Sequence, residues 1–179
     1  MPIRAVKMED VPQMLEIYRP FVENTPVSFE YVTPTVEEFS LRVEEHTRRF
    51  PWLVWEESGQ VLGYAYAGQV WERAAYRWDA ECSVYLAPQA RGRGLGRALY
   101  EALEKILGEL GYLVLYAVIT LENRDSIAFH RAMGFVPRAE FPRCGYKFGR
   151  WYGVCWMEKR LNGRPEEAPR PWQERKVRQ

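Results

Sequence analysis

The sequence predicts an α/β domain in which helices flank a mixed β-sheet. Two apolar strand patterns, residues 76–86 and 112–119, enclose one amphipathic helical pattern at 95–111. This order is typical of a parallel strand–helix–strand crossover. Two further strand patterns, 52–55 and 61–67, are joined by a short turn that contains glycine, which indicates an antiparallel hairpin. Parallel and antiparallel pairs in one chain predict a mixed sheet.

The N-terminal part contributes one strand and two helices before the hairpin. A short strand at 3–6 is followed by Asp10 and by a helix whose apolar positions recur at i, i+3, i+4 and i+7. Thr35 and Glu38 match a capping box, which predicts a second helix that runs to about His46.

The C-terminal part adds one helix and the last strands. A helix is expected at 123–133, and Gly134 is placed to cap its end. Strand patterns follow at 135–136, 147–148 and 154–160.

Length and composition favour one domain. A chain of 179 residues with 47% hydrophobic content is long enough for one buried core and short for two. We therefore expect a domain over 1–161. Residues 162–179 contain three prolines and two large apolar side chains, which predicts a flexible tail.

Composition also excludes several classes of partner. A net charge of +1 gives no reason to expect a nucleic-acid partner. Three cysteines without CxxC spacing and two histidines predict neither a disulfide framework nor a metal site. The N-terminus lacks an apolar signal region, and no apolar run is long enough to span a membrane. We expect a soluble, cytoplasmic protein.

The stretch 89–97 is the most informative part of the sequence, because a glycine-rich turn lies there between a strand and a helix. Glycines allow positive φ and close approach of the backbone, and the first helical turn offers unpaired N–H groups to an anion. Arginines in the same turn add donors suited to phosphates. The residues concerned are Arg91, Gly92, Arg93, Gly94, Gly96 and Arg97. They predict a site for a phosphate-bearing ligand.

Two other phosphate loops fit less well. A P-loop needs Lys-Ser/Thr after its last glycine, whereas Gly96 is followed by Arg97 and Ala98. A dinucleotide fingerprint needs the spacing G-x-G-x-x-G near the start of the sheet. The loop alone nevertheless leaves nucleotide, dinucleotide and CoA ligands open.

Residues 91–96 resemble the R/Q-x-x-G-x-G/A motif of the GNAT superfamily of acetyl-CoA-dependent N-acetyltransferases. Further segments are similar to the branch that contains phosphinothricin and methionine sulfoximine N-acetyltransferases, namely 66–68, 73–78, 81–86 and 147–151. The resemblance extends from Ile3 to about Leu161. It implies a GNAT fold with a mostly antiparallel sheet, flanked by helices, whose central parallel strands splay apart to admit CoA.

Acetyl transfer requires a base, and Glu81 is the candidate. An amine acceptor is mostly protonated at neutral pH and must lose a proton before it attacks. A carboxylate among mostly apolar or small strand neighbours is costly unless it is hydrogen-bonded or functional. The resemblance implies that Glu81 is the general base, directly or through water. A structural ion pair is the alternative.

The resemblance also implies the other roles. His130 would assist departure of the CoA thiolate, with an ordinary helix or core histidine as the alternative, and a backbone N–H near Tyr85 would stabilise the oxyanion. The cofactor-binding set that it implies is Val84, Tyr85, Leu86, Arg91, Gly92, Arg93, Gly94, Leu95, Gly96, Arg97, Asn123 and Ser126. The substrate-binding set is Phe29, Arg73, Tyr76, Arg77 and Lys147, with Phe29 as a pocket wall and Lys147 as an anion contact. For the segment with Arg73, Tyr76 and Arg77, solvated loop charges are the alternative.

We therefore expect an N-acetyltransferase that moves an acetyl group from acetyl-CoA to a small amino-acid-like amine in a ternary complex, without a metal. Acetylation of a protein N-terminus or lysine, and non-catalytic acyl-CoA binding, remain the alternatives. The resembled branch commonly forms homodimers, so a homodimer is expected.

Overall fold

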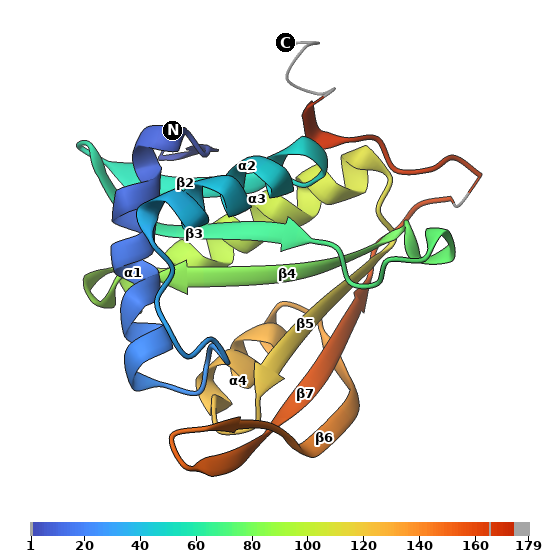
Figure 1. Cartoon of the computed structure of the whole chain (residues 1–179). Coiled ribbons are helices and arrows are strands. Elements are labelled where there is room, and N and C mark those ends of the chain that lie inside the picture. The colour runs from blue at the N-terminus through green and yellow to red at the C-terminus, as the bar shows by residue number, and fades with distance from the viewer. Residues whose placement is uncertain (1, 165, 174–179) are drawn as a thin grey trace.

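The computed structural model describes residues 2–164 and 166–173. One seven-stranded sheet runs through the domain in the order β1-β2-β3-β4-β5-β7-β6 (Figure 1). Its strands are β1 (Ile3–Ala5), β2 (Trp52–Glu57), β3 (Gln60–Gly68), β4 (Asp79–Leu86), β5 (Val114–Thr120), β6 (Val136–Lys147) and β7 (Arg150–Arg160). The helices are α1 (Val11–Asn24), α2 (Val36–Arg49), α3 (Leu95–Leu110) and α4 (Arg124–Ala132), with short 3-10 turns η1 (Met8–Asp10), η2 (Ala74–Tyr76) and η3 (Pro88–Ala90).

All strand pairs are antiparallel except β4 and β5. These two strands are paired at only three positions, where Asp79, Ala80 and Glu81 face residues 114–116. Beyond Glu81 the strands separate, as Figure 1 shows. The predicted mixed, mostly antiparallel sheet with a splayed parallel pair is confirmed.

Helices pack on both faces of the sheet and form two cores. The apolar stripe of α3 lies on one face, where Leu99, Leu103 and Leu107 are fully buried and the helix packs on β2, β3 and β4. On the other face, α1 and α2 cover β2 and β3 through a core that includes Trp52 and Tyr64. The capping box predicted for α2 is present, since Thr35 Oγ1 accepts the Glu38 N–H at 3.1 Å.

Two strands differ from the sequence expectation. Tyr76 belongs to η2, so β4 begins at Asp79, three residues later than the pattern suggests. The strand β6 is continuous over twelve residues, although the pattern indicates only its ends. Most of β6 is exposed, and its register with β7 shifts twice. The period-2 alternation that reveals a half-buried strand is therefore missing.

Residues 166–173 pack against the domain, where the sequence predicts a flexible tail. Trp172 is 6% exposed and lies in the core on the α3 side. The Arg170 N–H donates to Leu110 O at 2.9 Å, and Trp78 Nε1 donates to Glu167 O at 3.0 Å. Burial of one large aromatic ring stabilises this segment, which corrects the expectation for its described part. Residues 165 and 174–179 lie outside the described residues.

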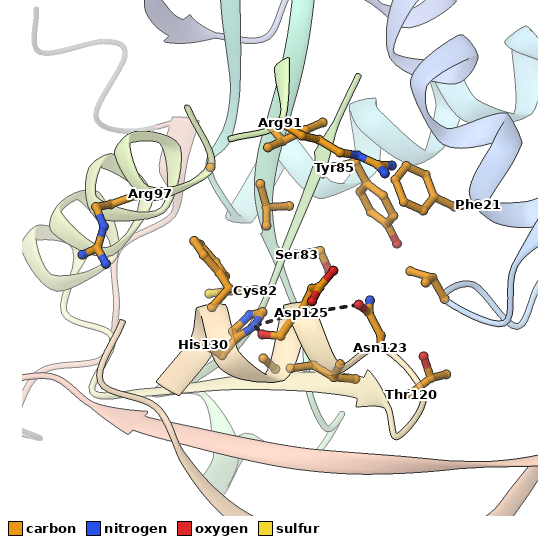
Figure 2. Close-up of a pocket in the computed structure, with 18 of the residues that line it drawn as sticks. Phe21, Cys82, Ser83, Tyr85, Arg91, Arg97, Thr120, Asn123, Asp125 and His130 are labelled. Atoms are coloured by element: carbon orange, nitrogen blue, oxygen red, sulfur yellow. Dashed lines mark hydrogen bonds between the residues drawn. The ribbon is translucent and has the colours of Figure 1, made fainter. Parts of the chain in front are cut away.

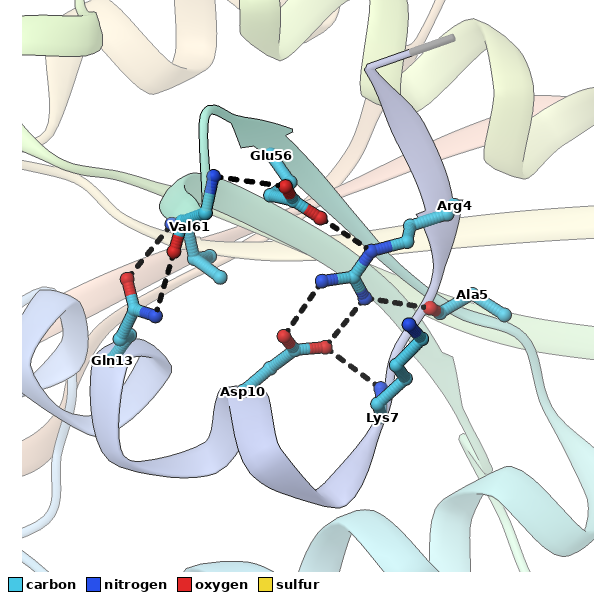
Figure 3. A network of polar contacts seen from close by, with 8 residues as sticks. Arg4, Ala5, Lys7, Asp10, Gln13, Glu56 and Val61 are labelled. Atoms are coloured by element: carbon cyan, nitrogen blue, oxygen red, sulfur yellow. Dashed lines mark hydrogen bonds and ion pairs between the residues drawn. The ribbon is translucent and has the colours of Figure 1, made fainter.

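A polar network holds the N-terminal strand to the rest of the sheet. Figure 3 shows the Arg4 guanidinium between two carboxylates: it donates to Asp10 at 2.7 and 2.8 Å and to Glu56 at 2.9 Å. Asp10 also accepts the Lys7 N–H at 2.7 Å. Burial acts to raise the pKa of Asp10, but the hydrogen bonds from Arg4 and Lys7 outweigh it and lower that pKa.

Replacement of Asp10 by asparagine should destabilise the fold at neutral pH. Loss of the charge leaves Arg4 without its bidentate partner, so we expect a loss of about 2–3 kcal/mol in the free energy of unfolding. Because the folded-state pKa of Asp10 is lowered, its contribution is present above the unfolded pKa and disappears as pH falls through the folded pKa. Urea unfolding of both proteins at several pH values measures this.

The matched control is Glu16→Gln, which removes an exposed i,i+3 ion pair with Arg19. That change should alter stability by less than about 0.5 kcal/mol. A difference between wild type and Asp10→Asn that stays constant down to pH 2 would contradict the linkage.

Candidate active site

A cavity of about 620 Å³ occupies the opening between β4 and β5. Its walls come from the ends of both strands, the first turns of α3 and α4, and the C-terminal end of α1 (Figure 2). The segments 82–86 and 117–120 face each other across it. The cavity therefore lies where the sheet has lost its own backbone pairing.

The register of β3 and β4 decides which backbone groups face this opening. Ala87 N–H donates to Leu62 O at 2.9 Å, and antiparallel partners alternate between bonded and non-bonded pairs. The backbone groups of Tyr85 therefore point to β3, and those of Val84 and Leu86 point into the cavity. Of the N–H groups near Tyr85 that are candidates for the oxyanion, those of Val84 and Leu86 face the cavity and that of Tyr85 does not.

The side chain of Tyr85 still lines the cavity. Its ring packs edge-on against Tyr18 and Phe21, with ring centroids 5.1 Å away in each case. Burial raises the pKa of Tyr85 well above its usual value, so the hydroxyl is neutral. It contributes shape and a neutral hydroxyl to this wall.

The glycine loop has the geometry that the sequence predicts. Gly92 and Gly94 have φ values of 72° and 80°, and a Cβ at either would meet no atom within 4 Å. Gly94 is the N-cap of α3, and the first intrahelical bond runs from Ala98 N–H to Gly94 O. The N–H groups of residues 95–97 thus remain available to an anion.

The three arginines of the loop have different surroundings. Arg91 lies over the Phe21 ring at 5.5 Å and lines the cavity. Arg97 also lines it and is 3.6 Å from Glu101. Arg93 instead donates to both oxygens of Glu57 at 3.0 Å, and its side chain is not part of the cavity wall. Of the three predicted cofactor-binding arginines, the structure thus brings the side chains of Arg91 and Arg97 to the cavity, and it pairs that of Arg93 with Glu57.

The start of α4 supplies polar groups to the opposite wall. Asn123 is the N-cap of α4, and its Oδ1 accepts the Ser126 N–H at 3.2 Å. Both residues line the cavity, and Figure 2 shows Asn123 in this wall. The amide nitrogen of Asn123 remains available, so capping and ligand binding are compatible.

His130 lines the cavity from α4 and is 4% exposed. Its Nδ1 lies 2.7 Å from Ser126 O, and its Nε2 lies 2.8 Å from the Tyr100 hydroxyl. Burial lowers the pKa of His130, although the hydrogen bond to the Ser126 carbonyl acts to raise it. The imidazole is therefore neutral at physiological pH, and both of its nitrogens have protein partners.

Glu81 lies at the last paired position before the strands separate. Ala80 and Cys82 face the α3 core, so the side chain of Glu81 projects from the opposite face of the sheet. Among the described residues, none donates a hydrogen bond to its carboxylate. Burial raises the pKa of Glu81. A partly buried carboxylate without a structural ion pair favours the functional explanation of this residue over the structural one.

The predicted substrate residues are only partly brought together. Tyr76 packs on Trp71 with ring centroids 4.7 Å apart, and Arg73 lies between these two residues in the chain. The Arg77 guanidinium lies 5.0 Å from the Trp78 ring and donates to Ala74 O. Phe29 is 36% exposed and packs over Gly145, where a Cβ would overlap with its ring.

Lys147 does not fit its predicted role. Its ammonium donates to the carbonyls of Val22, Thr25 and Ser28 at 2.6, 2.9 and 2.6 Å. All three donors are therefore used to hold the C-terminal end of α1. The expected contact with a substrate anion is corrected to a structural one.

The sequence reasoning missed several wall residues. Phe21, Thr25 and Val27 line the cavity from the end of α1 and the segment after it. Tyr100 was assigned to no function, although its hydroxyl contacts His130. Tyr100 lies beside the apolar stripe of α3, and nothing in that pattern indicates that its hydroxyl contacts another side chain.

Comparison with known proteins agrees with this geometry. The family model described as an acetyltransferase (GNAT) domain matches residues 3–156. The chain belongs to the GNAT acetyltransferase family. It is therefore an acetyltransferase, and acetyl-CoA is the cosubstrate of the family. The loop fits this ligand, because its open glycines and unpaired N–H groups suit a pyrophosphate.

Individual relatives cover most of the chain. A phosphinothricin N-acetyltransferase of Streptomyces viridochromogenes is 34% identical over 88% of this chain and 86% of its own. A phosphinothricin acetyltransferase of Sinorhizobium meliloti, solved with acetyl-CoA, has a TM-score of 0.87 at 36% identity, with 95% and 94% of the two chains covered. A ribosomal-protein-alanine N-acetyltransferase of Brucella melitensis has a TM-score of 0.87 at 38% identity, with 90% and 100% covered.

Two further observations concern membrane-spanning helices and metal-binding groups. No helix within the described residues is long and apolar enough to cross a membrane. The same residues hold no group of three or more His, Cys, Asp or Glu side chains that would bind a metal ion.

Proposed function

We propose that this protein transfers the acetyl group of acetyl-CoA to the amino group of a small amino-acid-like molecule, of the phosphinothricin or methionine sulfoximine type, in a ternary complex. The observation that carries the proposal is the position of Glu81. Its unpaired carboxylate lies where β4 and β5 part, on the face opposite to the α3 core. An acceptor on that face would meet the thioester through the opening.

Glu81 would act as the general base. Burial raises the pKa of Glu81, and a raised pKa improves a carboxylate as a proton acceptor. The proton that it takes, directly or through water, is the one that the ammonium group of the acceptor must lose before attack. Nothing in the described residues competes for its oxygens.

The backbone of β4 would stabilise the developing oxyanion. The register directs the N–H groups of Val84 and Leu86 into the opening, where no strand pairs with them. Fixed backbone donors of this kind stabilise charge that develops during acyl transfer. Their carbonyls offer β-strand-like pairing to the amide groups of the pantetheine arm.

The acceptor side has a wall of aromatic rings. Tyr116 faces Glu81 in the strand register, and Trp71 packs against both Tyr116 and Trp156 with ring centroids 5.2 and 5.6 Å away. Arg73 and Tyr76 follow Trp71 in the chain. Rings and a nearby guanidinium suit a small acceptor with an apolar body and an anionic end.

A screen for thiol release from acetyl-CoA tests this function. The acceptors are amino acids, methionine sulfoximine, methionine sulfone, phosphinothricin, polyamines and peptides. We expect the highest kcat/KM with an amino-acid-like acceptor. Thiol release with peptides alone would overturn the small-molecule assignment.

A protein N-terminus is the second candidate acceptor. The similarity to a ribosomal-protein-alanine N-acetyltransferase at 38% identity is the reason to test a protein N-terminus as acceptor. Peptides that begin with alanine therefore belong in the same screen. An acyl-CoA-binding module without activity would show tight CoA binding and no thiol release with any amine.

We also propose that the protein is a cytoplasmic homodimer. The hairpin of β6 and β7 exposes large apolar side chains, each about half accessible: Phe141, Tyr146, Phe148 and Trp151. Large exposed apolar side chains gathered on one hairpin are typical of an interface between subunits.

Replacement of Trp151 by aspartate should separate the subunits, because it places an unpaired charge in the proposed interface. Sedimentation should then give the mass of one chain instead of two. The control is Leu41→Asp, a change at an apolar residue of α2 that is 61% exposed, outside this hairpin. A wild-type protein that sediments as a monomer would exclude the dimer.

A further inference from the structure

A buried chain of hydrogen bonds crosses from β4 to α4 beside the cavity. The Tyr100 hydroxyl on α3 lies 3.0 Å from Cys82 O and 2.8 Å from His130 Nε2. His130 Nδ1 continues the chain to Ser126 O at 2.7 Å. Tyr100 is 0% exposed and is not part of the cavity wall, whereas Cys82 and His130 are.

The hydrogen bond between the Tyr100 hydroxyl and Cys82 O replaces a backbone hydrogen bond that the sheet lacks at this position. The register turns the carbonyl of Cys82 toward β5, and a continued parallel ladder would give it the N–H of Val118. The strands have separated before that position, so the ladder leaves this carbonyl without a strand partner. The Tyr100 hydroxyl supplies the donor instead, as a buried carbonyl requires.

The protons of the chain can be assigned from its two ends. Nδ1 of His130 lies 2.7 Å from Ser126 O, which only accepts, and 3.3 Å from Ser126 Oγ, so the shorter contact assigns a proton to Nδ1. In the neutral imidazole Nε2 is then an acceptor, and the single Tyr100 proton has two acceptors to choose from. In the imidazolium, Nε2–H donates to the Tyr100 oxygen and the Tyr100 proton goes to Cys82 O. Only that form satisfies all three bonds.

We propose that Tyr100 is a positioning residue for acetyl transfer. Its hydroxyl lies between the first unpaired carbonyl of β4 and Nε2 of His130, and in the neutral imidazole its proton is shared between these two acceptors. The contact of Nδ1 with Ser126 O favours the Nδ1–H tautomer of the ring. The acceptor of the Tyr100 proton also depends on the protonation state of His130: the proton goes to Cys82 O when the ring is an imidazolium. The inference rests on the proposed function, since it assigns Tyr100 to the same site.

Other titratable groups surround this chain. Cys82 and Glu81 come from β4, Glu104 from α3 and Asp125 from α4. Lys159 of β7 pairs with Glu104 at 2.7 Å. Among the titratable side chains of the described residues, Tyr100 is the one whose polar group hydrogen-bonds to the imidazole of His130.

Replacement of Tyr100 by phenylalanine removes the hydroxyl and keeps the ring. We expect kcat to fall about tenfold or more, with the KM for acetyl-CoA changed by less than about twofold, because the glycine loop is untouched. The matched control is Tyr112→Phe. Tyr112 lies in the same core at 3% exposure, packed on Phe50 away from the opening, and should retain the wild-type kcat.

Nitrogen NMR of ¹⁵N-histidine-labelled protein tests the chain without any acceptor. The sequence has two histidines, so His130→Asn identifies the signals of His130 by difference. We expect the Nδ1–H tautomer in the wild type. In Tyr100→Phe the pKa of His130 should fall further, because the imidazolium loses its Tyr100 acceptor.

Each readout is able to overturn the proposal. An Nε2–H tautomer in the wild-type protein would contradict the proton assignment, even if the variant did not fold. An unchanged kcat or an unchanged His130 pKa in Tyr100→Phe would contradict the positioning role. Absence of thiol release with every amine would refute the proposed function, while the tautomer would still report on the chain.

Discussion

Replacement of Glu81 by glutamine should lower kcat by about 10²-fold to 10⁴-fold. The amide has nearly the same shape, but it does not accept the proton that an ammonium acceptor must lose. The carboxylate lies at the edge of the opening and is not part of the cavity wall. The KM for acetyl-CoA should therefore change by less than about twofold. Initial rates of thiol release at saturating acceptor measure both constants.

The matched control is Asp79→Asn. Asp79 lies two residues earlier on the same face of β4, and burial raises its pKa as it does that of Glu81. Its replacement should leave kcat within about twofold of the wild type. An unchanged kcat in Glu81→Gln would remove this residue from the mechanism, and equal losses in the two variants would indicate a structural effect.

The pH profile gives a second test of Glu81. Because burial raises its pKa, the base becomes protonated at a pH above the usual range of a glutamate, and activity should decline from there toward acid pH. This decline in kcat should be absent from the residual activity of Glu81→Gln. If the same decline of kcat toward acid pH persists in Glu81→Gln, the decline belongs to the titration of another group.

Replacement of Trp172 by alanine should destabilise the protein by about 3–5 kcal/mol, the range found for large aromatic residues removed from a core. The ring of Trp172 is 6% exposed and packs in the core on the α3 side. Its loss would also free residues 166–173, including the carbonyl of Glu167 that accepts from Trp78. Urea unfolding followed by circular dichroism measures the change.

Gln173→Ala is the control for this substitution. Gln173 is the adjacent residue and its side chain is exposed, so its replacement should change stability by less than about 0.5 kcal/mol. Equal stability of Trp172→Ala and wild type would show that the tail does not contribute to the fold in solution.

Local patterns predicted the elements wherever one face of an element is buried. The stripe of α3 is of this kind. The strands β2 and β3 are instead continuous apolar runs with side chains in both cores. The glycine loop follows from backbone sterics at Gly92 and Gly94. The exposed strand β6 left no such pattern, so only its ends were expected. The buried Trp172 was missed because a single apolar residue among prolines and charges has no periodicity.

By itself, the sequence determined the kind of fold and the backbone geometry of the glycine loop, since these depend on local periodicity and on the conformations open to glycine. A role of Glu81 in the reaction stays a prediction. The tertiary structure decided which atoms face one another. Strand register turned Val84 and Leu86, not Tyr85, toward the opening. Packing across more than 100 residues gave Lys147 to the end of α1, and α3 brought Tyr100 to His130. Register and long-range packing are properties of the whole chain, and no local pattern encodes them.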